Sequence, residues 1–555
     1  MAEHAAVPKQ CGFDAELGCF IEGSAEWPGQ GPSAASALLA EIKGLPASPR
    51  VSFVSTTYGS EYSAGQGDGG ESGAGYGAGH GAASAAYNPN DWGRKFLPSN
   101  GGSAYVDCNH PELASPEVHD AHEFTAMWHA MLRIAQGAWR RANTRLRPAG
   151  RRMVVLVNNS DGHGHAYGSH LNFLLSTRCF RNILHRKLHQ LIALAAHQIS
   201  SICYTGAGKV GSENGRPPVN YQLAQRADFF EQLTSVDTMF HRGVVNLREE
   251  SHAKAALARL HCIFFDAGLC HAATLLKAGT MQLFLAMLER DEPVADVLLD
   301  DPLPALLAFS HDPMLQAKGR MVSGAEYTAV ELQQIILDKA AAFVAAGKAE
   351  GMVPRAPEII ALWADTLEKL RRRDLPELAR RLDWAAKLML IEGARAQAGL
   401  AWDAPELKTL DHLYSSLNPA EGLYWALEKN DAVERLVTDD EIEHFTHEPP
   451  EETRAWLRAQ MLRRMRPAAL LEVDWEVIRF RAWAPEAHAP CYYALHMPDP
   501  ARFSQADCNA ALEAAGNFRE ALGSLGLQQT DYWGRALCTD DKQEDKWATT
   551  ERRQS

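Results

Sequence analysis

Residues 100–117 read NGGSAYVDCNHPELASPE, and this stretch decides how the rest of the chain is interpreted. The segment from Ser103 to Cys108 is typical of a short strand, and Asp107 stands near its end. A carboxylate at the end of a strand is held rigidly, which suits a nucleophile or a general base.

The residues that follow this strand are polar. His110 and Glu112 come next in an expected turn, and Ser115 followed by proline is typical of a helix N-terminus. We therefore expect a helix from Ser115 through Trp128 to about Ala142. An ordinary turn leading into that helix is a simpler explanation for the same polar residues.

A second group of acidic residues lies near the N-terminus, in GFDAELG at residues 12–18. On a strand, Asp14 and Glu16 project from the same face because they are two residues apart. Two adjacent carboxylates repel each other unless a cation lies between them, and oxygen ligands suit Mg²⁺. A solvated strand face is the alternative.

Two further segments carry candidate ligands. Residues 158–170 read NNSDGHGHAYGSH, a histidine-rich glycine loop without the HExxH spacing of a zinc protease. Arg226 and Arg248 lie near strand-like segments, where forked guanidinium groups hold phosphate oxygens well. Ion pairing at the surface would also explain these arginines. Taken together, the acidic, histidine and arginine groups resemble an ATP–Mg²⁺ site on an antiparallel sheet.

Composition limits the alternatives. The formal net charge is −14, which argues against a general nucleic-acid-binding protein. No CxxC pair occurs, so neither a zinc ribbon nor a dense disulfide framework is expected. There is no signal-peptide pattern and no apolar run of about 20 residues, so we expect a cytoplasmic protein without membrane contact.

Residues 59–84 form a Gly/Ser/Ala/Tyr tract that cannot bury enough apolar surface to fold by itself. We expect a mobile loop there, either an insertion without a role or a lid over a site. The pattern changes again after residue 465. We expect a large domain over 1–465, a small domain over 466–525 and a charged tail over 526–555.

The order of these segments resembles the Pup ligase and Pup deamidase/depupylase family of the glutamine-synthetase-like carboxylate–amine ligase superfamily. Pup is a prokaryotic ubiquitin-like modifier. The resemblance runs from about Gly12 to about Phe518 and rests on a colinear series of segments: 100–117, 158–173, 206–211 (GAGKVG), 224–238 (AQRADFFEQLTSVDT), 243–269 and 381–393 (RLDWAAKLMLIEG). In YVDCNHPE, two residues separate the aspartate from the histidine. This spacing is similar to that of depupylases, whereas ligases typically have one more residue there.

The resemblance implies an α+β fold, with a curved antiparallel sheet that cradles the nucleotide, helices outside it and a small C-terminal domain. It implies that Asp107 is the catalytic nucleophile or base. Positions at or near the magnesium and phosphate site would be Asp14, Glu16, Glu112, His170 and His252, and Arg226 and Arg248 would face the nucleotide phosphates. The implied cofactors are Mg²⁺ and ATP, or ADP with phosphate, and the implied partner is a Pup-like modifier or its conjugates.

Three functions follow from this resemblance. The first is an ATP- and Mg²⁺-dependent amidohydrolase that cleaves an isopeptide bond or a C-terminal glutamine amide of the modifier. The second is a ligase that forms such a bond. The third is a diverged nucleotide-binding ATPase, phosphatase or binding protein, because Asp14 and Leu171 stand where the family usually has glutamates.

Overall fold

The computed structural model describes residues 6–22, 33–47, 91–484, 488–515 and 518–536. The Gly-rich tract at 59–84 and most of the charged tail therefore lie outside the described residues. The centre of the fold is a sheet whose neighbouring strands all pair antiparallel. Its order is β13 (Leu257–Cys262), β8 (Ser169–Ser176), β1 (Cys11–Glu16), β6 (His110–Ala114), β5 (Ser103–Asp107), β4 (Asp91–Phe96) and β3 (Leu45–Pro46).

The alternation of side chains along these strands gives the sheet one apolar and one polar face. On β1, Phe13 and Ala15 lie in the main hydrophobic core, and the Phe13 ring packs edge-on against Phe124 and Trp128 at centroid distances of 5.3 and 4.8 Å. Both partners belong to α2 (Ala121–Leu146), so this helix covers the apolar face of β1. The antiparallel α+β fold expected from the sequence is confirmed.

The segment after Asp107 differs from the sequence-based expectation. Residues 110–114 form β6, and α2 begins only after Asp120, whose carboxylate accepts hydrogen bonds from the His122 and Glu123 backbone N–H groups. Ser115 does not cap a helix. Its hydroxyl oxygen instead accepts a 2.9 Å hydrogen bond from the Phe13 N–H, which ties β6 to β1.

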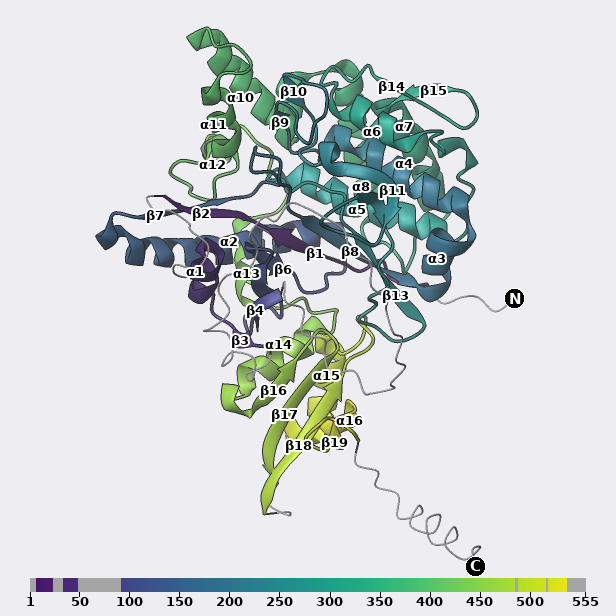
Figure 1. Cartoon of the computed structure of the whole chain (residues 1–555). Helices are drawn as coiled ribbons and strands as arrows, with labels where there is room; N and C mark the ends of the chain where they lie inside the picture. The colour runs from purple at the N-terminus through teal and green to yellow at the C-terminus, as the bar shows by residue number, and fades with distance from the viewer. Residues whose placement is uncertain (1–5, 23–32, 48–90, 485–487, 516–517, 537–555) are drawn as a thin grey trace, which may run out of the picture.

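Helices and small sheets surround the main sheet (Figure 1). The short strands are β2 (Gly18–Glu22) with β7 (Arg152–Leu156), β9 (Lys209–Val210) with β10 (Tyr221–Gln222), β11 (Phe230–Ser235) parallel to β12 (Arg242–Asn246), and β14 (Lys318–Arg320) with β15 (Glu326–Thr328). The helices are α1 (Ala34–Glu41), α3 (Thr177–Arg181), α4 (Leu188–Thr205), α5 (His271–Glu289), α6 (Pro302–Ser310), α7 (Ala329–Ala345), α8 (Ala356–Arg372), α9 (Leu375–Ala379), α10 (Asp383–Ala398), α11 (Pro405–Tyr414), α12 (Leu423–Lys429), α13 (Asp439–His447) and α14 (Ala455–Arg464). Among the described residues, no helix combines the length and apolar character needed to cross a membrane.

The C-terminal part forms its own sheet, drawn in yellow-green in Figure 1. The strands are β16 (Leu470–Val473), β17 (Val477–Ala484), β18 (Ala489–His496) and β19 (Gln528–Thr530), and they accompany α15 (Gln505–Ala514) and α16 (Phe518–Ser524). A separate apolar cluster fills this unit and includes Leu457 and Met461 of α14. Strand β19 lies in the segment that the sequence assigned to the charged tail, so the folded unit extends beyond residue 525.

Candidate active site

The candidate site lies on the polar face of the main sheet, where five adjacent strands bring acidic and histidine side chains together. Asp14 is the direct cross-strand partner of His170, and Glu16 is the partner of Glu112. Asp14 and Glu16 share one face of β1, because Phe13 and Ala15, which alternate with them along the strand, point into the core on the other face.

The first group consists of the carboxylates of Glu16, Asp107 and Glu112, which each offer an oxygen within 4.8 Å of the others. The Gly168 N–H donates a 2.8 Å hydrogen bond to Glu16, and the Tyr105 hydroxyl donates a 2.6 Å hydrogen bond to Glu112. Burial raises the pKa of Glu16, and it raises the pKa of Glu112 strongly with the help of the neighbouring carboxylates. Without a cation these two carboxyl groups therefore favour their protonated forms, and a bound cation would favour the ionised forms.

The second group consists of Asp14, His170 and His261, whose ligand atoms also lie within 4.8 Å of one another. Asn172 links the group: its side-chain N–H donates to Asp14 at 2.8 Å, and its carbonyl oxygen lies 2.9 Å from His261 Nδ1. Burial, with nearby arginines, lowers the pKa of both imidazoles well below the usual value. Both rings are therefore neutral at pH 7, which is the form that binds metal ions.

Asp107 ends β5 at a two-residue turn. Cys108 and Asn109 have φ angles of 44° and 70°, and Asp107 pairs with His110 across them. Positive φ at both central residues is typical of a type I′ hairpin turn. The Cys108 thiol donates to Asp107 Oδ1 at 3.5 Å, and burial with the adjacent carboxylate raises its pKa to about 12. The thiol is therefore protonated at pH 7 and is a poor nucleophile.

Both predicted arginines lie near this site. Arg226 is buried, donates to the Ile263 carbonyl and has an Nε with no hydrogen-bond partner among the described residues. Arg226, Arg248, Arg242 and Arg259 all lower the pKa of His170, after burial as the largest cause, so their positive charges lie near this ring. An anionic group beside His170 would be stabilised by them.

His252 lies apart from the two groups. It has a φ angle of 45° and lines a neighbouring cavity of about 90 Å³ between the main sheet and the C-terminal unit. Other residues lining this cavity are Asp14, Asn172, Arg259, Arg454 and Trp475.

The structure thus brings together Asp14, Glu16, Asp107, Glu112 and His170, with Arg226 and Arg248 nearby, and places His252 next to them. Sequence reasoning missed His261, Asn172, Arg242 and Arg259. The alternation in LARLHC at 257–262 was the available signal, because it places Arg259 and His261 on the face opposite Leu260.

Leu171 was expected to remove a carboxylate from the metal site. In the structure its side chain is fully buried in the hydrophobic core, between His170 and Asn172, which face the site. Position 171 therefore faces away from the candidate ligands, so a leucine at this position does not remove a ligand from the site.

The donor sets fit divalent cations. The all-oxygen group of Glu16, Asp107 and Glu112 suits Mg²⁺, which is a hard ion. The Asp14, His170 and His261 group mixes oxygen with two imidazoles, a set that also accepts transition ions. Mn²⁺ suits carboxylate ligands as Mg²⁺ does, so it is a probe for both groups.

Sequence and structure comparisons agree on the relatives of this chain. The Pup deamidase/depupylase of Mycolicibacterium smegmatis is 34% identical over 428 residues, which covers 77% of this chain and 82% of that protein. A Pup–protein ligase of Micrococcus luteus is 34% identical over 400 residues, covering 70% and 84%.

The fold matches a crystal structure of Pup in complex with its ligase PafA, with a TM-score of 0.69 and 21% identity over 93% of this chain and 97% of that one. The profile of the family described as Pup-ligase protein matches residues 58–479. On these grounds the chain belongs to the Pup-ligase protein family.

Proposed function

We propose that this protein is an amidohydrolase, dependent on a nucleotide and a divalent cation, that cleaves an isopeptide bond or a C-terminal glutamine amide of Pup. The observation that carries the proposal is the position of Asp107. Its carboxylate lies within 4.8 Å of the Glu16 and Glu112 oxygens and is fixed at a two-residue turn. Names of relatives support the substrate class, since they include Pup deamidase/depupylases.

Asp107 is suited to act on the amide carbon as nucleophile or as base. As nucleophile, its oxygen forms a bond to the carbonyl carbon, the C–N bond breaks, and the amine leaves with a proton from solvent. Water then hydrolyses the resulting anhydride and restores the carboxylate. The neighbouring Cys108 does not compete, because its thiol is protonated at pH 7.

The residues around Asp107 would hold the cofactors. Glu16 and Glu112 would hold one cation beside Asp107, and Asp14, His170 and His261 would hold another. Bound cations supply positive charge that stabilises phosphates and a developing oxyanion. The unpartnered Nε of Arg226 suits a phosphate oxygen.

The second candidate is a ligase that forms the same bond. Relatives named Pup–protein ligase are as similar to this chain in sequence as the depupylases are. Sequence similarity therefore favours the ligase and the hydrolase equally. The two-residue turn at Cys108-Asn109 supports the hydrolase, because it has the shorter spacing typical of depupylases. A diverged binding protein is less well supported, since Leu171 does not remove a ligand from the site.

The test is to incubate the purified protein with ATP, Mg²⁺ and either a Pup conjugate or free Pup with an acceptor protein. We expect release of Pup without stoichiometric ATP loss, and we expect Asp107→Asn to abolish it. Cys108→Ser is the matched control and should retain release, because it keeps the turn and the neighbouring carboxylate. Conjugation coupled to ATP consumption would instead establish the ligase, and release that persists in Asp107→Asn would exclude Asp107 as the reactive group.

A further inference from the structure

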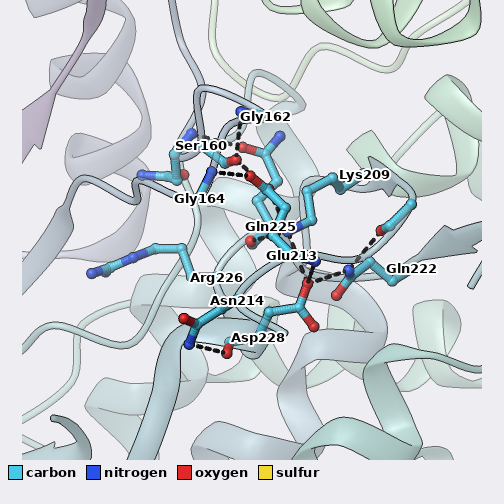
Figure 2. A network of polar contacts seen from close by, with 12 residues as sticks. Ser160, Gly162, Gly164, Lys209, Glu213, Asn214, Gln222, Gln225, Arg226 and Asp228 are labelled. Carbon is cyan, nitrogen blue, oxygen red and sulfur yellow. Dashed lines mark hydrogen bonds and ion pairs between the residues drawn. The ribbon is translucent and has the colours of Figure 1, made fainter. Parts of the chain in front are cut away.

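A polar network outside the candidate site connects the buried Lys209 to the glycine loop at 158–168 (Figure 2). The Lys209 ammonium group donates to Glu213 at 2.8 Å, to the Gln225 carbonyl at 3.1 Å and to Asp228 at 3.0 Å. These three contacts use all three of its N–H donors. The Lys209 and Asp228 side chains are at most 2% exposed, so the network is a fixed part of the interior.

Glu213 is the member of this network that contacts the loop. One carboxylate oxygen accepts from the Ser160 hydroxyl and the other accepts a 3.0 Å hydrogen bond from the Gly164 N–H. The Ser160 hydroxyl oxygen in turn accepts from the Gly162 N–H at 3.1 Å. Figure 2 shows Glu213 between Lys209 and the loop, so its carboxylate joins the buried network to the loop backbone.

The other end of the loop reaches the candidate cation site. Tyr167 is fixed to Asn159 by backbone and side-chain hydrogen bonds of 3.2 and 3.1 Å, and the next N–H, of Gly168, donates to Glu16. This end has little room: a Cβ at Gly168 would overlap Nε2 of His170 and lie 2.8 Å from Glu16 Oε1. The position of the loop backbone therefore sets the position of the Glu16 carboxylate.

We propose that Glu213 is a positioning residue that fixes the 158–168 loop and, through Gly168, orients the Glu16 carboxylate for its cation. This inference rests on the cation site of the proposed function. Glu213 does not touch the reacting groups, and it acts by holding two donors of the loop in place. Groups that hydrogen-bond a metal ligand directly change metal affinity about 10- to 100-fold when they are removed, and Glu213 acts one contact further from the ligand.

The experiment measures Mn²⁺ binding and hydrogen exchange in the full chain. We expect Glu213→Gln to lower the affinity for free Mn²⁺ about tenfold and to speed amide exchange in the 158–168 loop. The matched control is Glu231→Gln, because Glu231 is an exposed carboxylate nearby that pairs with His241 at 2.9 Å and is not bonded to the loop. It should change neither quantity.

A double-mutant cycle with Glu16→Gln separates positioning from general destabilisation. If Glu213 acts through Glu16, Glu213→Gln should lower Mn²⁺ affinity less than twofold in the Glu16→Gln background. Equal losses in both backgrounds would overturn the proposal, as would faster exchange without any loss of affinity. Should Glu213→Gln fail to fold, Ser160→Ala removes one loop contact and leaves the Lys209–Glu213 ion pair in place.

The cycle also distinguishes this inference from the function on which it rests. If Glu16→Gln alone leaves Mn²⁺ affinity unchanged, the cation site at Glu16 is wrong and the role of Glu213 falls with it. If Glu16→Gln weakens binding but Glu213→Gln does not, the site stands and the positioning role is overturned.

Discussion

Asp14 on β1 and His170 on β8 lie directly opposite each other in the main sheet, although the glycine loop and several other elements separate them in the sequence. The register of this strand pair places an acidic oxygen beside a neutral imidazole, and His261 of the next strand completes the group. Neither the N-terminal acidic motif nor the histidine segment forms this group alone. The antiparallel pairing of β1 with β8 and of β8 with β13 creates it.

The first prediction compares His261 with His252. His261→Ala should weaken Mn²⁺ binding at least about tenfold, because it removes one of three ligand atoms that lie within 4.8 Å of one another. His252→Ala should change the affinity for free Mn²⁺ by less than about threefold, because His252 lines the adjacent cavity and belongs to neither ligand group. Calorimetric titration of Mn²⁺ measures both, and a larger loss in His252→Ala would contradict this arrangement.

The second prediction concerns Gly168. Gly168→Ala should lower Mn²⁺ affinity, because the new methyl group would overlap the His170 ring and press on Glu16. The matched control is Gly393→Ala in α10, where nothing lies within 4 Å of the added Cβ. That change should stabilise the protein by about 0.5–1 kcal/mol and leave Mn²⁺ binding unaltered. Equal Mn²⁺ affinities in the two variants would refute the crowding argument.

The sequence predicted the N-terminal half of the site better than the rest. Asp14 and Glu16 were assigned to one strand face from their spacing alone, and Asp107 was placed at a strand end, because both inferences depend on local alternation. The antiparallel α+β fold followed from the resemblance to a known family.

The sequence-based predictions that failed concern features that depend on contacts between distant segments of the chain. Strand β8 begins with SHLN but continues as an apolar run, so its alternation is weak and the strand was not predicted. Ser115 looks like a helix cap, yet its hydroxyl is used by Phe13 on a paired strand. Leu171 could be assigned to the core only after its strand was known.

The third prediction uses Leu171 to test the two faces of the sheet. Leu171→Ala should lower the free energy of unfolding by about 2–4 kcal/mol, because it leaves a cavity in the core. Its affinity for Mn²⁺ should remain within about twofold of the parent. Asn172→Ala, one residue along the strand, should weaken Mn²⁺ binding, because it removes the group that links Asp14 to His261. Loss of Mn²⁺ affinity in Leu171→Ala without loss of stability would place position 171 in the site.

The fourth prediction concerns the joint between the main sheet and the C-terminal unit. Glu117 follows β6 and accepts hydrogen bonds of 2.7 Å from both Arg454 and Arg458, and Arg458 also donates to the Gly101 and Trp475 carbonyls. Burial acts to raise the pKa of Glu117, but the two guanidinium groups outweigh it and hold the pKa at about 2, below its ordinary 4.5. Because this pKa is depressed in the folded state, the stabilisation is complete above pH 4.5 and is lost as the pH falls toward 2.

Glu117→Gln should therefore destabilise the protein at pH 7 by about 3 kcal/mol or more, since both buried arginines lose their charged partner. The difference in thermal midpoint between the parent and Glu117→Gln should be constant from pH 7 to pH 5 and should narrow below pH 4.5, because the parent carboxylate is then protonated as well. Taking the difference between the two proteins cancels the titration of the carboxylates that they share. Glu368→Gln removes a partly exposed acid that pairs with Arg371 and Arg372 at the surface of α8. Because such surface pairs contribute about 1 kcal/mol or less, its thermal midpoint should stay much closer to that of the parent than the midpoint of Glu117→Gln does. A difference between parent and Glu117→Gln that stays constant down to pH 3 would show that Glu117 is not the group that loses its charge in this range.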